Sequence, residues 1–166
     1  ESLETVLPLV KKYGGLVVAL TLDEQGIPQT VDGRVKIARR IVETASAYGI
    51  SKKDIVVDVL TMAVSTGADA ALITLESLGR VKKELGVKTV LGVSNVSFGL
   101  PQRERINASF FTLAMRAGLD AAIINPCSAA MMEAYRIYGA IAGLDSNCAD
   151  YIACFSTRDD QAKTLS

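Results

Sequence analysis

Four short apolar runs, each followed by a stretch of helical periodicity, constrain the fold of this chain more than any other feature of its sequence. The runs begin near residues 16, 54, 88 and 121, which places them 38, 34 and 33 residues apart. The run at 54–59 is apolar at the consecutive positions 55–57, which is typical of strands covered on both faces in a parallel sheet. Because such strands alternate with helical stretches, the sequence predicts an α/β fold of consecutive βα units with parallel strands.

The boundaries of the elements follow from apolar periodicity and from turn residues. We expect strands at residues 16–22, 54–59, 89–93 and 121–125. Helices are expected from residue 3 to a stop at Gly14, over 32–48, from about Leu72 to Leu85, from near Pro101 to Gly118, and over 128–142. A last short helix is expected within 147–155, followed by a frayed end. The sequence thus predicts one domain at residues 1–155 and a tail at 156–166.

Two arrangements of consecutive βα units fit this pattern, an open doubly wound sheet and part of a (β/α)8 barrel. A complete barrel takes about 250 residues, whereas this chain has 166 residues and would supply only part of one. The outer strands of a partial barrel, around Val18 and Ile123, would leave open hydrogen-bonding edges that need a partner.

The composition excludes several classes of function. Eighteen basic and 18 acidic residues balance, which argues against nucleic acid or an anionic membrane as a partner. No apolar run approaches a membrane span and no signal peptide is evident, so a cytoplasmic protein is expected. The absence of histidine excludes Ser-His-Asp and Cys-His catalysis and His-ligated zinc. Three scattered cysteines form neither a metal clip nor a disulfide framework, and we expect no metal site.

Polar side chains follow the predicted strands where each of them ends. Asp58 ends a buried run, Ser94 and Asn95 follow the third strand, and Asn125 follows the fourth. The carboxyl ends of parallel strands share one rim, where active sites of such folds are built. Asp58 is the most informative of these residues, because a buried carboxylate needs strong hydrogen-bond donors and a ligand rich in N–H groups would supply them.

Each of these residues also has a purely structural interpretation. Asp58 could cap a helix or brace its loop, Asn95 could be a left-handed turn residue, and Asn125, which precedes a proline, could form a plain turn. Arg103 and Arg105 lie in the first turn of a helix, where the helix dipole disfavours cations. Either one of these two arginines is held there by a specific contact, or both are solvated residues of the surface. The acidic pair at 23–24 fits turn chemistry.

The segment at 92–107, GVSNVSFGLPQRERIN, resembles the pterin-binding methyltransferase family, together with LTLDEQGIP at 20–28 and AAIINP at 121–126. The family includes the folate domain of cobalamin-dependent methionine synthase and the methyltetrahydrofolate:corrinoid methyltransferases. The resemblance extends from residue 1 to about 155. The family fold is a (β/α)8 barrel, so the resemblance implies that this chain is its C-terminal half, strands five to eight.

The resemblance also implies roles for individual residues. Asp58 would accept hydrogen bonds from the N–H groups of the pterin ring. Asn95 would be the catalytic residue near N5 of the pterin, with Ser94 supporting it. Arg103 would lie at the same mouth, and Ile123 would pack against the ring.

The function implied is methyl transfer between N5 of methyltetrahydrofolate and the cobalt of a corrinoid (cobalamin) carried by a partner protein. The family's pterin-binding aspartate and asparagine on strands three and four have no counterpart in this chain. An N-terminal half-barrel, or a second copy forming a homodimer, is therefore expected as a further partner. A catalytically silent half-barrel that serves as an assembly unit, and a pterin-binding module without transfer activity, remain alternatives.

Overall fold

Four parallel strands form a single open sheet at the centre of the protein. The computed structural model describes the backbone of residues 2–164 and the side chains of residues 3–156. The strands are β1 (Val17–Leu20), β2 (Ile55–Asp58), β3 (Lys88–Gly92) and β4 (Ala121–Ile123), and each pairs with the next one along the chain. This order has no reversal, whereas a doubly wound sheet needs one. The expected α/β fold is confirmed, and the arrangement is that of half a (β/α)8 barrel.

The helices were expected in nearly the right places. They are α1 (Ser2–Tyr13), α2 (Val31–Ala47), α3 (Ala70–Leu85), α4 (Arg103–Ala117), α5 (Ala129–Ile141) and α6 (Ala149–Thr164), with 3-10 turns η1 (Lys52–Asp54), η2 (Val64–Thr66), η3 (Val93–Ser97) and η4 (Ser146–Cys148). The expected end of the last helix near residue 155 and the frayed end after it are wrong, because α6 continues to Thr164. Residues 165–166 lie outside the described part of the chain.

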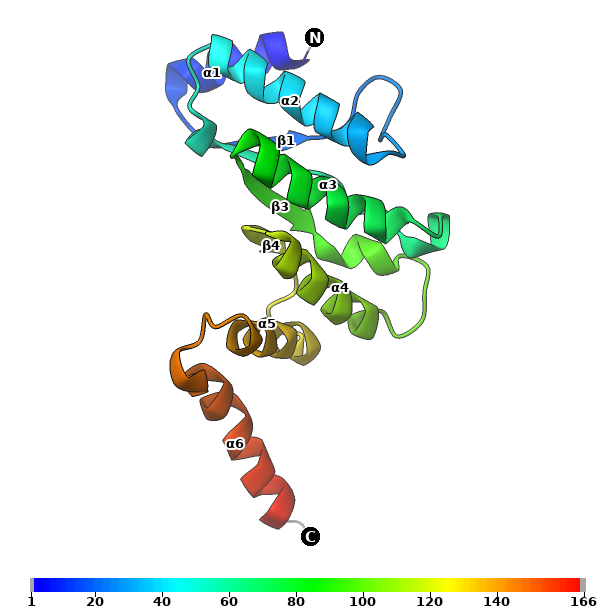
Figure 1. Ribbon diagram of the computed structural model, residues 1–166, viewed down its shortest axis with the longest axis vertical. Helices are drawn as coiled ribbons and strands as arrows, with labels where there is room; N and C mark the ends of the chain where they lie inside the picture. The colour runs from blue at the N-terminus through cyan, green and yellow to red at the C-terminus, as the bar shows by residue number, and fades with distance from the viewer. Residues whose placement is uncertain (1, 165–166) are drawn as a thin grey trace.

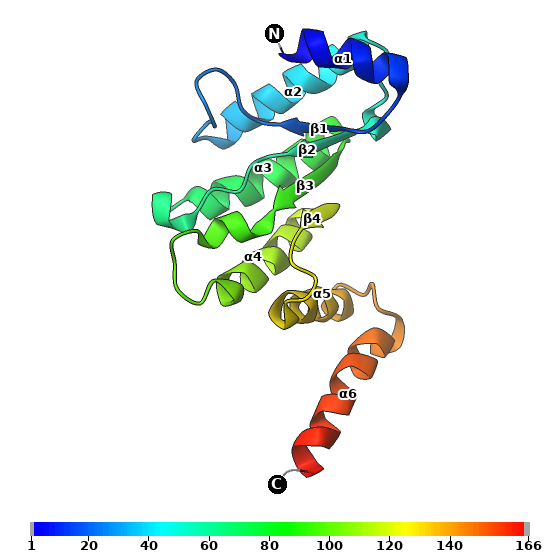
Figure 2. The ribbon, with the colours of Figure 1, turned by 180° about the vertical axis from the view of Figure 1, so that it is seen from behind.

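The two faces of the sheet differ in burial. Figures 1 and 2 show α2, α3 and α4 side by side along one face of the sheet. The strand residues that point toward these helices form the core, and they include Ala19, Ile55, Val57 and Leu91. The alternate residues lie on the uncovered face, where Val18 is 54% and Ile123 is 65% exposed. The sheet is therefore packed on one side only, and its edge strands β1 and β4 carry large exposed apolar residues.

Local signals explain where several helices begin and end. Thr30 caps α2, since its side chain accepts a hydrogen bond from the Gly33 backbone N–H at 3.2 Å. Gly86 and Gly118 end α3 and α4 in the left-handed conformation. Each helix can therefore turn back toward the sheet without strain at its C-terminus.

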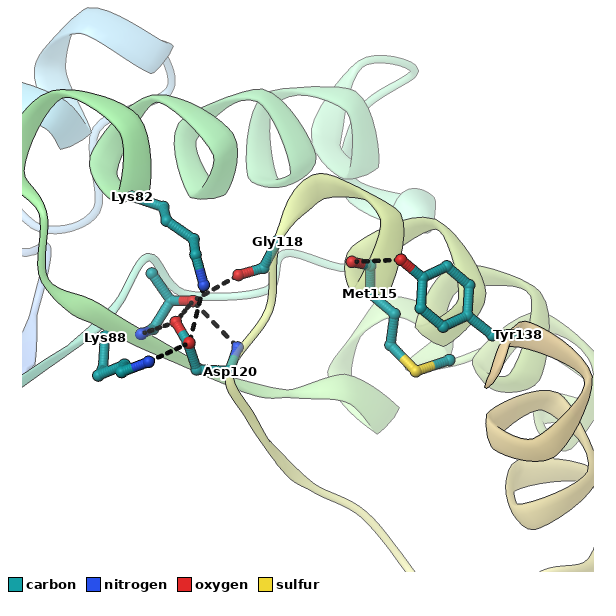
Figure 3. A network of polar contacts seen from close by, with 7 residues as sticks. Lys82, Lys88, Met115, Gly118, Asp120 and Tyr138 are labelled. Carbon is teal, nitrogen blue, oxygen red and sulfur yellow. Dashed lines mark hydrogen bonds and ion pairs between the residues drawn. The ribbon is translucent and has the colours of Figure 1, made fainter. Parts of the chain in front are cut away.

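A carboxylate fastens β4 to its neighbours at the amino ends of the strands (Figure 3). Asp120 accepts hydrogen bonds from the Lys82 and Lys88 ammonium groups at 2.7 and 3.0 Å. Its second oxygen accepts from the backbone N–H and the hydroxyl of Thr89 at 3.0 and 3.2 Å. On α4, the Met115 carbonyl accepts a bond from the Tyr138 hydroxyl of α5 at 3.2 Å. These contacts hold the last βα unit against the third.

Helix α6 is set apart from this layered body. Both views show it reaching away from the sheet, beyond α5, on which it packs (Figures 1 and 2). Its first turns carry a contact between the rings of Tyr151 and Phe155, whose centroids are 4.7 Å apart. Among the described residues, no helix is both long and apolar enough to cross a membrane.

Candidate functional site at the carboxyl ends of the strands

The loops that follow β1, β2 and β3 lie together at one rim, on the left of the molecule in Figure 2. This position follows from the parallel sheet, whose strands all end on the same side. The rim brings Asp58 at the end of β2, the turn η3 that follows β3, and Ile123 at the end of β4 to one side of the sheet. Within the sheet, Asp58 is paired with Val90, and Ile123 is paired with Gly92.

Asp58 is a partly buried carboxylate on the uncovered face. Its Oδ1 accepts a hydrogen bond from the Leu60 backbone N–H at 2.8 Å, and the described residues supply no other hydrogen bond to this carboxylate. Burial raises the pKa of Asp58 above its ordinary value, and the bond from Leu60 offsets only part of that rise. The loop-bracing interpretation is thus correct for Oδ1, while Oδ2 accepts no hydrogen bond from the described residues.

The residue that braces Asp58 has an unusual backbone. Leu60 has φ of 64°, a left-handed conformation that a bulky side chain rarely adopts. Such a conformation persists only where the surrounding structure enforces it, and it is concentrated at functional sites. The loop after β2 is therefore held in an unfavourable shape by its surroundings.

Asn95 lies in η3, directly beyond the end of β3. Its side chain is exposed, and its backbone carbonyl accepts the Phe98 N–H at 3.2 Å. The left-handed turn interpretation of Asn95 is wrong, because the residue is not among those with positive φ. The Asn95 amide nitrogen lies 3.3 Å from where a Cβ would stand at Gly92, so the glycine leaves room for the amide near the strand end.

Arg103 braces the same turn. Its Nε donates to the Ser97 hydroxyl at 3.0 Å and its Nη2 donates to the Ser94 carbonyl at 2.7 Å. The Ser97 hydroxyl in turn donates to the buried Asn107 side chain at 2.7 Å. These bonds give a reason for a cation in the first turn of α4, although Arg103 is also exposed, as the solvated-surface interpretation expects. Arg105 is exposed, as that interpretation expects.

A small cavity of about 170 Å³ opens between the ends of β3 and β4 and the helices α4 and α5. Ser94, Ile123 and Asn125 line it, and the buried Ser128 hydroxyl donates to Glu104 at its wall, at 3.0 Å. Asn125 also accepts the Cys127 N–H at 3.0 Å, so its interpretation as a turn residue is correct. The structure thus brings Ser94 and Ile123 to one cavity and ties Arg103 to Ser94, whereas Asp58 lies outside it.

The acidic pair after β1 is turn chemistry, as expected. Asp23 accepts the Gln25 N–H at 2.9 Å, and its backbone pairs with Gly26. Among the described residues, no group of three or more acidic or cysteine side chains is placed to hold a metal ion.

The sequence reading missed Arg34, the largest fully buried side chain of the described residues. It lies in the first turn of α2 and reaches the loop that carries Leu60. A signal was present, because Arg34 lies on the same helical face as Ala38, Ile41 and Ala45, which are all buried. It missed Thr61 as well. The buried hydroxyls of Thr21 and Thr61, near the rim, have no hydrogen-bond partner among the described residues.

A family model described as pterin binding enzyme matches residues 2–125. The chain is 34% identical over 142 residues to a methylcorrinoid:tetrahydrofolate methyltransferase of Eubacterium limosum, covering 84% of this chain and 52% of that protein. It is 38% and 36% identical over 127 residues to methionine synthases of Mycobacterium leprae and Mycobacterium tuberculosis, covering 72% of this chain in each case. The chain spans about half the length of the first relative, and 10% and 11% of the other two.

Proposed function

The chain belongs to the pterin-binding enzyme family, and we propose that it is half of a barrel that transfers a methyl group between N5 of methyltetrahydrofolate and a corrinoid cobalt. The names of its relatives support folate and corrinoid as the substrate classes, because one is a methylcorrinoid:tetrahydrofolate methyltransferase and two are methionine synthases. In this proposal the corrinoid arrives on a partner protein and supplies the cobalt that exchanges the methyl group.

One observation carries the proposal: a partly buried carboxylate with one free oxygen lies on the same rim as an exposed, neutral amide. Asp58 receives a single protein hydrogen bond among the described residues, so two ring N–H groups of a pterin would complete its hydrogen bonding. Burial disfavours the charged carboxylate, and donors on a ligand would relieve that penalty. Asp58 is therefore proposed to bind the pterin edge.

Asn95 is proposed to act at N5. A tertiary amine is a poor leaving group until it is protonated, so the bond between N5 and the methyl carbon breaks readily only when N5 carries a proton. The Asn95 amide oxygen can accept a hydrogen bond from protonated N5, an interaction that is stronger in the transition state than in the neutral substrate. The electron pair of the broken bond then stays on N5.

Three further residues complete the proposed pterin site. Ser94 and Arg103 fix the turn that carries Asn95, through the bond from Arg103 to the Ser94 carbonyl. Ile123, at 65% exposure beside Gly92, offers an apolar surface against which the ring could pack. This wall is built from β2, η3, α4 and β4, and the opposite wall is proposed to come from an N-terminal half-barrel or a second copy.

Methyl transfer tests the proposal. The chain is incubated with ¹⁴C-methyl-labelled methyltetrahydrofolate and free cobalamin, with and without a separately expressed N-terminal half-barrel of a full-length relative. We expect label to appear on cobalamin only in the complemented sample, and to fall by roughly 100-fold or more in Asn95→Ala, as for loss of one transition-state hydrogen bond. An inactive complemented barrel that is correctly assembled would contradict the proposal.

The exposed apolar edge favours one alternative, a silent half-barrel that serves as an assembly unit. Val18 and Leu20 line a groove of about 680 Å³ between β1 and α1. Such an apolar groove is suited to binding a partner. A pterin-binding module without transfer activity is the other alternative. Calorimetry with methyltetrahydrofolate separates them, since the module binds folate and the assembly unit does not.

A further inference from the structure

A buried arginine with no acidic partner lies behind the rim, and the proposed mechanism leaves it unused. Arg34 has no exposed surface. None of the ion pairs formed by the described residues includes it. Burying a cation without an acidic partner costs free energy. The hydrogen bonds that Arg34 makes must therefore offset that cost.

Those hydrogen bonds converge on the loops of the rim. The Arg34 Nη1 donates to the carbonyls of Val59 and Leu60 at 3.0 and 2.8 Å. Its Nε donates to the Pro28 carbonyl, in the loop after β1, at 2.9 Å. Nη1 also lies 3.2 Å from the Thr74 hydroxyl of α3. A single side chain thus joins the loops after two neighbouring strands to two helices.

The contact with Leu60 connects Arg34 to the proposed pterin site. The Leu60 carbonyl is held by Arg34, and the Leu60 N–H binds Asp58 Oδ1 at 2.8 Å. Leu60, whose backbone is left-handed with φ of 64°, uses both its N–H and its carbonyl in these bonds. Without the guanidinium, the loop would lose the contacts that offset this unfavourable conformation.

We propose that Arg34 is a positioning residue for Asp58: it fixes Leu60 so that the Leu60 N–H occupies one carboxylate oxygen and leaves the other for the ligand. The identity of that ligand as a pterin rests on the proposed function. The orienting role itself concerns only the contacts between Arg34, Leu60 and Asp58. Arg34 touches no substrate in this proposal.

The test compares Arg34→Lys with Arg39→Lys in the full chain. Arg39 is a matched control, because it lies on the same helix but is exposed and paired with Glu84. Hydrogen exchange of the Leu60 amide and the ¹³C shift of the Asp58 carboxyl are measured by NMR. Calorimetry with 5-methyltetrahydrofolate, using the chain complemented with an N-terminal half-barrel, gives the affinity.

In Arg34→Lys we expect exchange of the Leu60 amide to quicken by roughly tenfold, as for one lost hydrogen bond, while the core amides of Val57 and Leu91 are unchanged. The Asp58 carboxyl shift should move, and folate affinity should fall by a similar factor. Arg39→Lys should leave all of these at their wild-type values. A folded Arg34→Lys chain with an unchanged Leu60 amide would overturn the proposal, as would equal acceleration of the core amides.

If Arg34→Lys does not fold, Thr74→Val is the second variant, since the Thr74 hydroxyl lies 3.2 Å from Nη1 and 3.4 Å from the Leu60 carbonyl that Nη1 holds. It should give a smaller acceleration at Leu60 and leave the core amides unchanged, and no local effect would again overturn the role of Arg34. If wild-type chain in the complemented sample does not bind folate, the proposed function fails, but the exchange measurements still decide whether Arg34 orients Asp58.

Discussion

At the scale of single residues, two carboxylates at opposite ends of the strands show how surroundings set the behaviour of the same side chain. Asp58 at the carboxyl ends receives one protein hydrogen bond, and burial raises its pKa. Asp120 at the amino ends is also partly buried, which by itself raises its pKa. The bonds from Lys82, Lys88 and Thr89 outweigh that effect and lower the pKa below the ordinary value. Asp58 thus has one oxygen without a hydrogen bond from the described residues, whereas both oxygens of Asp120 accept hydrogen bonds.

Asp58→Asn is expected to stabilise the chain at neutral pH while abolishing pterin binding. Because the pKa of folded Asp58 is raised above 3.8, the folded state binds its proton more tightly than the unfolded state does. Stability contributed by this group is therefore present at low pH and falls as the pH rises through the raised pKa. Thermal melts at pH 4 and pH 7 should show a higher Tm for Asp58→Asn at pH 7 only. An equal or lower Tm at pH 7 would contradict this.

Asp120→Ala is expected to destabilise the chain by about 1–3 kcal/mol at pH 7, because it leaves the buried Thr89 N–H without an acceptor. The sign is opposite to that of Asp58. The lowered pKa gives stability that is present above 3.8 and is lost as the pH falls through the folded value. Urea denaturation at pH 7 and pH 3 should show a smaller difference from wild type at pH 3. Asp120→Asn, which keeps an acceptor oxygen, should lose less.

At the scale of helices and strands, apolar periodicity predicted the positions of most elements well. Burial on one side of the sheet requires that periodicity in the elements that form the core. The strand expected at 54–59 is Ile55–Asp58, and the helix expected at 128–142 is Ala129–Ile141. The strand expected at 16–22 is only Val17–Leu20, since the apolar pattern continues past the last paired residue. The bracing of η3 by Arg103 and the burial of Arg34 could not be read in this way, because both depend on contacts between distant parts of the chain.

The glycine that ends α4 gives a prediction at this scale. Gly118 has φ of +106°, and a Cβ there would lie 2.9 Å from the Lys82 side chain. Gly118→Ala should therefore destabilise the chain by about 1–2 kcal/mol, the usual penalty for a left-handed residue with a side chain. Urea denaturation measures the difference. Gly67→Ala is the matched control and should be nearly neutral, because Gly67 is extended and has open space around its Cα.

At the scale of the whole molecule, helices cover one face of the sheet and leave the other face uncovered. The described helices cover the face that carries the core, while Val18, Leu20 and Ile123 stay substantially exposed on the other. Contiguous exposed apolar residues at an open sheet edge mark a surface for association. The chain spans about half the length of its methylcorrinoid:tetrahydrofolate methyltransferase relative. The partner proposed for this surface is therefore a complementary set of strands.

Val18→Lys is expected to weaken association of the chain with an N-terminal half-barrel or with itself, without lowering the stability of the monomer. Val18 is 54% exposed on the edge strand, so a lysine there is solvated in the monomer and buried only in the assembly. Analytical ultracentrifugation over a range of concentrations measures the association. Leu72→Lys is the control, as Leu72 is 63% exposed on α3, away from the edge. Equal association of both variants and wild type would argue against assembly through β1.

The network around Asp120 has a consequence for how this protein could change over time. It fastens β3, β4 and α3 at the end of the sheet that is opposite to Asp58 and Asn95. Because the anchoring contacts and the proposed chemistry occupy different ends, loops at the rim can acquire new residues while the anchor is retained. Arg34 is the exception, since it connects the rim to the core. Engineering of new substrates should therefore leave the loop after β2 intact, and in the turn after β3 it should keep Ser94 and Asn95.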